Sequence, residues 1–300
     1  MNIAPTPAYR GRFAPSPTGA LHFGSLVAAL GSWLRARSQD GRWIIRIEDL
    51  DPPREVAGAA QQQIATLAAF GLTSDETIVW QHTRHEAYAD ALKQLIAREH
   101  AFACWCSRND LLRSNGLHRS PCVAAPDPQR VPAWRLRVPN RIVGFDDRLL
   151  GHYEQSLMDC VGDFVIRRVE GYFAYQLAVV VDDAAQGISE VVRGADLLDS
   201  TPRQILLQQL LRLPTPAYLH LPLALDADGR KLSKQDSALP VDADDPLPVL
   251  RAALVFLGVP RERLDGLRTV DALLIAALHA FELAAIPRTP SIVRMHHGLS

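Results

Sequence analysis

The stretch RGRFAPSPTGALHFGS at residues 10–25 decides the fold. It predicts a short strand that ends at Arg12 and Phe13, a tight turn, and the first turn of a helix. The turn follows from the run Pro-Ser-Pro-Thr-Gly at 15–19, which neither a strand nor a helix can continue. From residue 21 onward, apolar side chains recur at helical spacing. A strand, a turn and a helix in this order predict the start of a β–α–β unit.

The beginning of this helix is a candidate phosphate site. His22 and Gly24 lie where backbone N–H groups have no partner within the helix, and such an end attracts anions. His22 can donate to a phosphate, and Gly24 leaves room for a nucleotide to approach the backbone. Taken alone, the motif also fits an ordinary strand–turn–helix. The remote segment KLSKQ favours the phosphate site, because Lys231 and Lys234 can bring two ammonium groups to a polyphosphate.

Composition limits the class of protein. The chain has 300 residues, of which 48% are hydrophobic, and this suffices for a sizeable core of about two domains. The N-terminus lacks a long apolar run, and no apolar stretch has bilayer length, so we expect a cytoplasmic protein without a membrane segment. The four cysteines do not suggest a disulfide scaffold. Because the net charge is −1, an RNA site would have to be a local basic surface.

A second predicted strand supplies an acid to the same crevice. Residues 42–47 are apolar or long-stemmed, as expected of a parallel strand that is covered on both faces. Glu48 follows this strand, and ligands of open α/β sheets bind beyond the carboxyl ends of strands. We therefore expect Glu48 to face the crevice beside Arg12 and Ser16. Asp51, which precedes two prolines, is expected to cap the next helix.

Strand and helix patterns resume in the second half of the chain. Tyr175 lies in the apolar segment 172–182, and Arg193 follows a predicted strand. An arginine there can pair with a carboxylate in fork geometry, and Tyr175 can donate to the same ligand, although a core tyrosine is an equally ordinary interpretation. The chain is thus predicted to be α/β, with a parallel sheet interrupted by an insertion. The predicted divisions are 1–100 (first half of the catalytic domain), 101–165 (inserted domain), 166–238 (second half, with the KLSKQ loop) and 239–300 (helical region).

The insertion carries a candidate metal site. Its ligands follow the spacing C-x-C-x11-H-x3-C and are Cys104, Cys106, His118 and Cys122. Three thiolates and an imidazole suit a tetrahedral zinc ion. The alternatives are unrelated free thiols, or His100 in place of His118. A closed site with four protein ligands would hold the insertion together rather than catalyse. The remaining thiol, Cys160, is expected to be a small buried hydrophobe.

The segments PSPTGALHFG and KLSKQ resemble the two signature motifs of class I aminoacyl-tRNA synthetases. RIEDLD, AYQLAVVVDD and VVRGADLL are similar to the glutamyl branch of that class, and the resemblance covers most of residues 10–235. One departure is Ser25, where many class I enzymes have histidine. The resemblance implies a Rossmann-type parallel sheet with a zinc-bearing insertion. It implies catalytic roles for His22, Gly24, Lys231 and Lys234, of which His22, Gly24 and Lys234 bind ATP. The implied glutamate-binding residues are Arg12, Phe13, Ala14, Pro15, Ser16, Glu48, Tyr175 and Arg193.

The Cys-x-Cys insertion and the short C-terminal region resemble the glutamyl-Q tRNA(Asp) synthetase family. Members of this family activate glutamate with ATP and esterify it to queuosine at the wobble position of tRNA(Asp). Residues 239–300 are too few for the anticodon-binding region of a full glutamyl-tRNA synthetase. The resemblance therefore implies a cytoplasmic, monomeric ligase with ATP, L-glutamate and queuosine-bearing tRNA(Asp) as partners. It further implies one structural zinc ion, and Mg²⁺ that accompanies ATP.

Three other functions compete with this interpretation. The first is a glutamyl-tRNA synthetase that acts on the 3′ end of tRNA(Glu), which the short C-terminal region disfavours. The second is a non-enzymatic module that binds glutamate or tRNA, which the intact HFG and KLSK motifs disfavour. The third is a nucleotidyltransferase with a similar turn, for which the cysteine cluster and the set of Arg12, Tyr175 and Arg193 would have no use.

Overall fold

The predicted β–α–β unit forms one half of the central sheet region. A computed structural model describes residues 8–225 and 241–293. In it β1 (Arg10–Phe13) and β2 (Arg42–Ile47) pair in parallel, and α1 (Phe23–Arg37) connects them. The short strand β3 (Val79–Trp80) adds to β2 in parallel, which gives the order β1-β2-β3. The strand β1 ends at Phe13 and the strand β2 spans 42–47, both as predicted.

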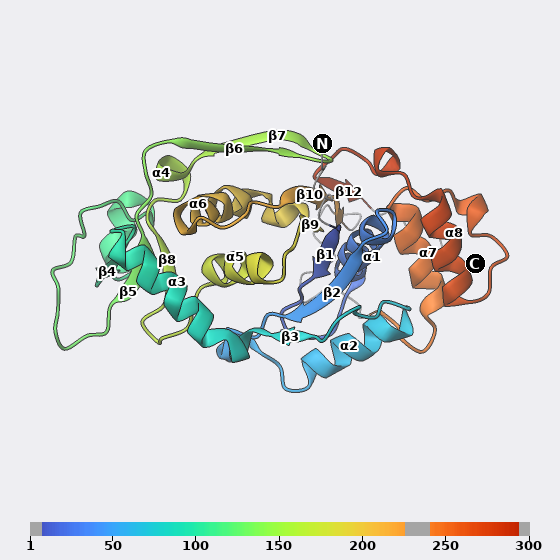
Figure 1. The fold of residues 1–300 in the computed structure, drawn as a ribbon, viewed down its shortest axis with the longest axis horizontal. Coiled ribbons are helices and arrows are strands. Elements are labelled where there is room, and N and C mark those ends of the chain that lie inside the picture. Colours follow the sequence, from blue (N-terminus) through green and yellow to red (C-terminus); the bar gives the residue numbers. More distant parts are fainter. Residues whose placement is uncertain (1–7, 226–240, 294–300) are drawn as a thin grey trace, which may run out of the picture.

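A second sheet of four strands continues the region. Its order is β7-β6-β10-β9, with β9 (Glu190–Gly194) and β10 (Ala217–Leu221) parallel. The hairpin of β6 (Ile142–Asp147) and β7 (Gly151–Ser156) joins this sheet through β6, which runs parallel to β10. The two sheets meet where the backbone N–H of residue 189 donates to the carbonyl of residue 10 at 3.0 Å. Residues predicted to belong to an insertion thus contribute two strands next to the central region (Figure 1).

Three other strands after residue 100 form a separate antiparallel sheet. Its strands are β4 (Ala101–Cys104), β5 (Ala133–Leu136) and β8 (Phe164–Arg167), in the order β4-β5-β8. The short helix α4 (Leu157–Cys160) follows the hairpin. The prediction that Cys160 is buried is wrong: this thiol is exposed, because α4 has a single turn and buries only Leu157.

Helices cover both ends of the sheet region. They are α2 (Ala59–Ala69), α3 (His85–Ala97), α5 (Tyr175–Ala185), α6 (Thr201–Leu211), α7 (Pro246–Phe256) and α8 (Val270–Ala280). Short 3₁₀ segments are Pro52–Arg54, Gln81–Arg84, Asn109–Ser114, Ala195–Ser200, Arg261–Arg263 and Leu283–Ala285. Asp51 stands at the predicted N-cap position, before the 3₁₀ segment Pro52–Arg54, but its carboxylate makes no cap hydrogen bond and accepts instead from Arg54 and Arg168.

The C-terminal helices share a core with α1. Phe23 at the start of α1 meets Phe256 of α7 edge to face, with ring centroids 5.9 Å apart. The core on this side also contains Leu30 of α1 and Leu273 of α8, both fully buried. A strand that the sequence did not predict, β12 (Ser291–Val293), pairs in parallel with β11 (Leu223–Leu225). These contacts attach α7 and α8 to the central region at the opposite end from the β4-β5-β8 sheet (Figure 1).

A second buried cluster lies between α3, α5, α6 and the strands β8 and β9. It contains Leu95 of α3, Leu177 of α5 and Leu206 of α6, each fully buried. The β6–β7 hairpin runs along the outer edge of this layer (Figure 1). Within the described ranges, no helix combines the length and apolarity that crossing a bilayer requires.

Candidate active site

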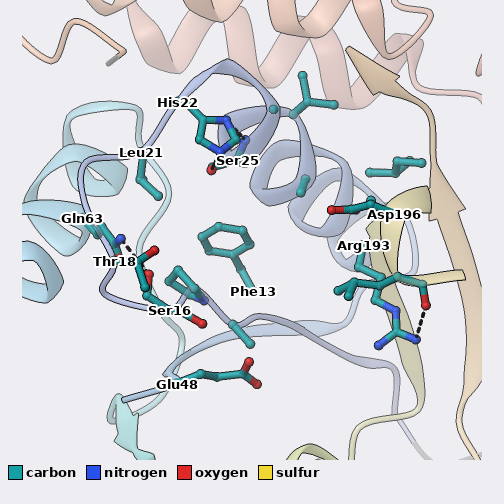
Figure 2. Close-up of a pocket in the computed structure, with 18 of the residues that line it drawn as sticks. Phe13, Ser16, Thr18, Leu21, His22, Ser25, Glu48, Gln63, Arg193 and Asp196 are labelled. Carbon is teal, nitrogen blue, oxygen red and sulfur yellow. Dashed lines mark hydrogen bonds between the residues drawn. The ribbon is translucent and has the colours of Figure 1, made fainter. Parts of the chain in front are cut away.

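A cavity of about 990 Å³ opens at the carboxyl ends of β1, β2, β9 and β10. Its wall contains the turn after β1, the first turn of α1 and the residue after β2. Figure 2 shows His22 and Ser25 on one side of this space, Glu48 opposite them, and Arg193 and Asp196 on a third side. Parallel strands bring their carboxyl ends to one edge, and ligands of α/β proteins bind there.

Ten of the predicted site residues line this cavity. They are Arg12, Phe13, Ala14, Pro15, Ser16, His22, Gly24, Glu48, Tyr175 and Arg193. Two further residues predicted to be catalytic, Lys231 and Lys234, lie outside the described residues. Residues of the segment 12–24 therefore face the same space as Tyr175 and Arg193, although they are far apart in sequence.

His22 is the N-cap of α1. Its Nδ1 accepts from the backbone N–H of Ser25 at 3.2 Å, and its Nε2 lies 3.1 Å from the Ser25 hydroxyl. Burial lowers the pKa of His22, and the negative charge of Asp196 partly opposes this. The ring is therefore neutral near pH 7. Ser25, which stands where many class I enzymes have histidine, thus contacts His22.

The turn between β1 and α1 is held by a residue that the sequence analysis missed. Gln63 of α2 donates from its side-chain amide to the carbonyls of Ser16 at 3.1 Å and Gly19 at 2.7 Å. Gly19 has φ 146°, a conformation that an L-residue rarely adopts. Gln63 is one of three consecutive glutamines on α2 and belongs to no motif, so only the three-dimensional structure reveals this contact.

Arg193 is buried and surrounded by hydrogen-bond acceptors. Its side chain donates to the Tyr175 hydroxyl at 3.3 Å, to Thr201 Oγ1 at 2.8 Å and to His220 Nε2 at 3.1 Å. Burial raises the pKa of Tyr175, although the charge of Arg193 opposes this, so the phenol stays protonated. The sequence predicted that Tyr175 and Arg193 contact one ligand, and it did not predict the contacts of Arg193 to Thr201 and His220.

A buried ion network lies beneath the cavity. Arg12 donates to both carboxylate oxygens of Asp183 at 3.2 Å, and Arg46 donates to Asp183 at 2.8 Å and to Glu48 at 3.1 Å. Burial works against the charge of Asp183, but the two arginines prevail and hold the pKa of Asp183 below its usual range. Burial raises the pKa of Glu48, and the charges of Arg46 and Arg12 oppose that rise.

A second candidate site lies away from the cavity, beside β4. The ligand atoms of Cys104, Cys106, His118 and Cys122 all lie within 4.8 Å of one another. His118 is buried, and its Nδ1 pairs with Asp163 at 3.0 Å. Among the described residues its Nε2 has no hydrogen-bond partner. An orphaned buried nitrogen that faces three thiols, in a ring oriented by a carboxylate, fits a metal ligand. His100 is not part of this cluster.

Comparisons with known proteins agree with this geometry. Residues 8–271 match the family model described as "tRNA synthetases class I (E and Q), catalytic domain". Among solved structures, a glutamate–tRNA synthetase from Elizabethkingia anophelis has a TM-score of 0.81 at 23% identity, over 96% of this chain and 68% of that one. A glutamate tRNA ligase from Elizabethkingia meningosepticum, solved in complex with its amino acid, has a TM-score of 0.79 at 21% identity. That match covers 94% of this chain and 66% of the ligase, so this chain spans slightly less than two thirds of the ligase. These two likenesses show the fold.

Curated relatives show to which family of class I tRNA synthetases the chain belongs. The glutamyl-Q tRNA(Asp) synthetase of Xanthomonas oryzae pv. oryzae is 56% identical over 95% of this chain and 94% of its own length. The protein of the same name from Burkholderia cenocepacia is 53% identical over 94% of this chain and 99% of its own length. The chain therefore belongs to the glutamyl-Q tRNA(Asp) synthetase family of class I tRNA synthetases.

The ion network makes a prediction about stability. Replacing Asp183 with alanine leaves Arg12 and Arg46 buried without their shared counter-ion, and we expect a loss of about 3–5 kcal/mol in the free energy of unfolding. Urea titration monitored by tryptophan fluorescence measures this loss. The matched control is Asp90→Ala, which removes an exposed ion pair with Lys93 and should leave the stability near that of the unaltered chain. Equal stability of the two variants would contradict the role given to Asp183.

Proposed function

We propose that this chain activates L-glutamate with ATP and transfers the glutamyl group to queuosine of tRNA(Asp). The observation that carries the proposal is one cavity that is lined both by the start of α1 and by Glu48, Tyr175 and Arg193. Family membership and the names of the curated relatives support the same reaction and the same tRNA. A cytoplasmic, monomeric enzyme remains part of this proposal.

The amino acid is held by charge complementarity. Glutamate carries two carboxylates and one ammonium group, so its site needs cations and at least one acid. Arg193, together with the Tyr175 hydroxyl, offers donors to a carboxylate at one side of the cavity. Glu48 offers an acceptor to the ammonium group at another side, and Arg12 also lines the cavity. Ser16 and its neighbours in the turn complete the proposed glutamate site.

ATP is held at the start of α1. The backbone donors of the first helical turn and His22 approach the phosphates, and Gly24 carries no side chain that would block them. Adding a Cβ at Gly24 would bring it to 3.2 Å from the His22 ring, closer than most such contacts. Lys231 and Lys234 lie outside the described residues, and the sequence alone assigns them to the phosphates. Mg²⁺ accompanies ATP as part of the substrate.

The reaction consists of two displacements. A carboxylate oxygen of glutamate attacks the α-phosphorus of ATP, the bond to the β-phosphate oxygen breaks, and glutamyl adenylate and pyrophosphate form. A hydroxyl of queuosine then attacks the adenylate carbonyl and releases AMP. Neither step requires a protein nucleophile, so the chain contributes positioning and the stabilisation of charge that develops on the phosphates.

The first step predicts glutamate-dependent exchange of pyrophosphate into ATP. His22→Ala and Lys234→Ala should lower the exchange rate by about 10²–10³-fold, since each removes a donor to developing charge. The control is His82→Ala, which changes an exposed histidine outside the cavity wall and should leave the rate unchanged. Absence of exchange in the folded, unaltered chain would favour a non-enzymatic binding module.

The second step predicts a choice of tRNA. Radiolabelled glutamate should be transferred to tRNA(Asp) that carries queuosine, and neither to the same tRNA with unmodified guanosine nor to tRNA(Glu). Filter retention of acid-precipitated tRNA measures the transfer. Charging of tRNA(Glu) instead would establish the competing glutamyl-tRNA synthetase activity.

We further propose that the ion held by Cys104, Cys106, His118 and Cys122 is zinc. Three thiolates and an imidazole favour zinc over harder cations. Asp163 would fix the ring so that Nε2 of His118 faces the ion. Four protein ligands fill a tetrahedral shell, so the ion would connect β4 to the loop that follows it and take no part in the reaction.

The zinc proposal predicts a metal content of about one zinc ion per chain. Cys122→Ser should lose most of this zinc, as measured by elemental mass spectrometry after gel filtration, because one thiolate ligand is removed. Cys160→Ser is the matched control, since that thiol is exposed and outside the cluster, and it should retain the ion. Equal zinc content in both variants would overturn the assignment.

A further inference from the structure

Asp147 brings a negative charge from the β6–β7 hairpin into the interior. It is the last residue of β6, and its side chain is buried. Its carboxylate accepts from the backbone N–H groups of Leu149 at 3.0 Å and Leu150 at 2.9 Å, and from both the backbone and the ring of His220. These donors outweigh the effect of burial and hold the pKa of Asp147 below its usual range.

The carboxylate of Asp147 determines which nitrogen of His220 carries a proton. His220 is fully buried on β10, and its Nδ1 lies 2.7 Å from Asp147. On the other side of the ring, Nε of Arg193 donates to Nε2 at 3.1 Å. A guanidinium has only donors, so Nε2 must bear a lone pair and Nδ1 must carry the proton. Burial lowers the pKa of His220, and the adjacent Arg193 lowers it further against the pull of Asp147, so the ring stays neutral.

Three different elements therefore meet behind Arg193. Asp147 comes from the hairpin, His220 from β10 and Thr201 from the start of α6, and the last two accept directly from the guanidinium. The remaining contact, from Nη1 to Tyr175, lies among residues that line the cavity. An arginine side chain has many rotamers. Because His220 binds Nε of Arg193 and Thr201 binds Nη2, the planar guanidinium is fixed and Nη1 points in a defined direction.

We propose that Asp147 and His220 are positioning residues that fix the guanidinium of Arg193 for the substrate carboxylate. This inference rests on the proposed function, in which Arg193 binds glutamate. Neither residue lines the cavity, so both act through Arg193. It follows that the β6–β7 hairpin, which belongs to the segment predicted as an insertion, sets the affinity of the amino-acid site.

The test compares two replacements of His220 in the intact chain. The side-chain amide of glutamine reaches the place of Nε2 and can accept from Arg193, whereas that of asparagine reaches only the place of Nδ1. In glutamate-dependent pyrophosphate exchange, His220→Asn should raise the KM for glutamate by about tenfold, the effect of losing one hydrogen bond to a charged group. His220→Gln should stay within about threefold, and the KM for ATP should change by less than about twofold in both variants.

A second pair of variants distinguishes the effect of Asp147 from that of its neighbour Asp146. Asp147→Asn should raise the KM for glutamate in the same way as His220→Asn. Asp146→Asn is the matched control on the same strand, because Asp146 is exposed and pairs with the exposed His152, and it should leave the KM unchanged. Nitrogen NMR of the unaltered chain should show His220 with a protonated Nδ1 and a bare Nε2, a readout that does not depend on how the variants fold.

The outcomes distinguish this inference from the function on which it rests. An unaltered chain without glutamate-dependent exchange overturns the proposed function, and the glutamate role of His220 with it. If the unaltered chain is active but His220→Asn and Asp147→Asn keep their KM for glutamate, the positioning role alone is overturned. An Nε2-protonated ring also overturns it, since that ring cannot accept from Arg193.

Discussion

The rest of the structure depends on the burial of the Arg46 guanidinium. This side chain is fully buried on β2, and its charge is balanced by Asp183 and Glu48, with a further contact to Gln186 at 2.7 Å. An uncompensated charge in the interior costs several kcal/mol, so β2 and α5 can pack only if these partners assemble together. Arg12 of β1 joins through the same Asp183. The network thus ties the first strands to a helix more than 130 residues later, and it sets Glu48 at the edge of the cavity.

The same requirement explains how a divided chain forms one site. The β1–α1–β2 unit supplies His22 and Glu48, and the strand β9 supplies Arg193. Between them lie the antiparallel sheet beside the cysteine cluster and the β6–β7 hairpin. If this intervening segment only interrupted the chain, its removal would leave the cavity unchanged. The hairpin instead pairs with β10 and places Asp147 behind Arg193, so the segment is part of the site's construction.

Local signals made much of the fold predictable. The β–α–β unit followed from turn residues and helical spacing, and the placing of Glu48 beside Arg12 followed from the rule that ligands bind at the carboxyl ends of strands. The exposure of Cys160, the contacts of Asp51 and the strand β12 depend on tertiary packing, which no local pattern encodes. The same holds for Asp183 and His220, whose partners are remote in sequence.

Two buried aspartate–histidine pairs show why residue type alone did not identify their roles. In each pair a carboxylate lies against Nδ1 of the ring, Asp163 with His118 and Asp147 with His220. The chemistry then differs because of what faces Nε2: three cysteine thiols in one case and the guanidinium of Arg193 in the other. A lone pair on Nε2 can serve a soft metal ion as well as an N–H donor, so the proposed metal ligand His118 and the proposed positioning residue His220 use the same local arrangement. The spacing of cysteines reveals the first. Only the pairing of β6 with β10 reveals the second.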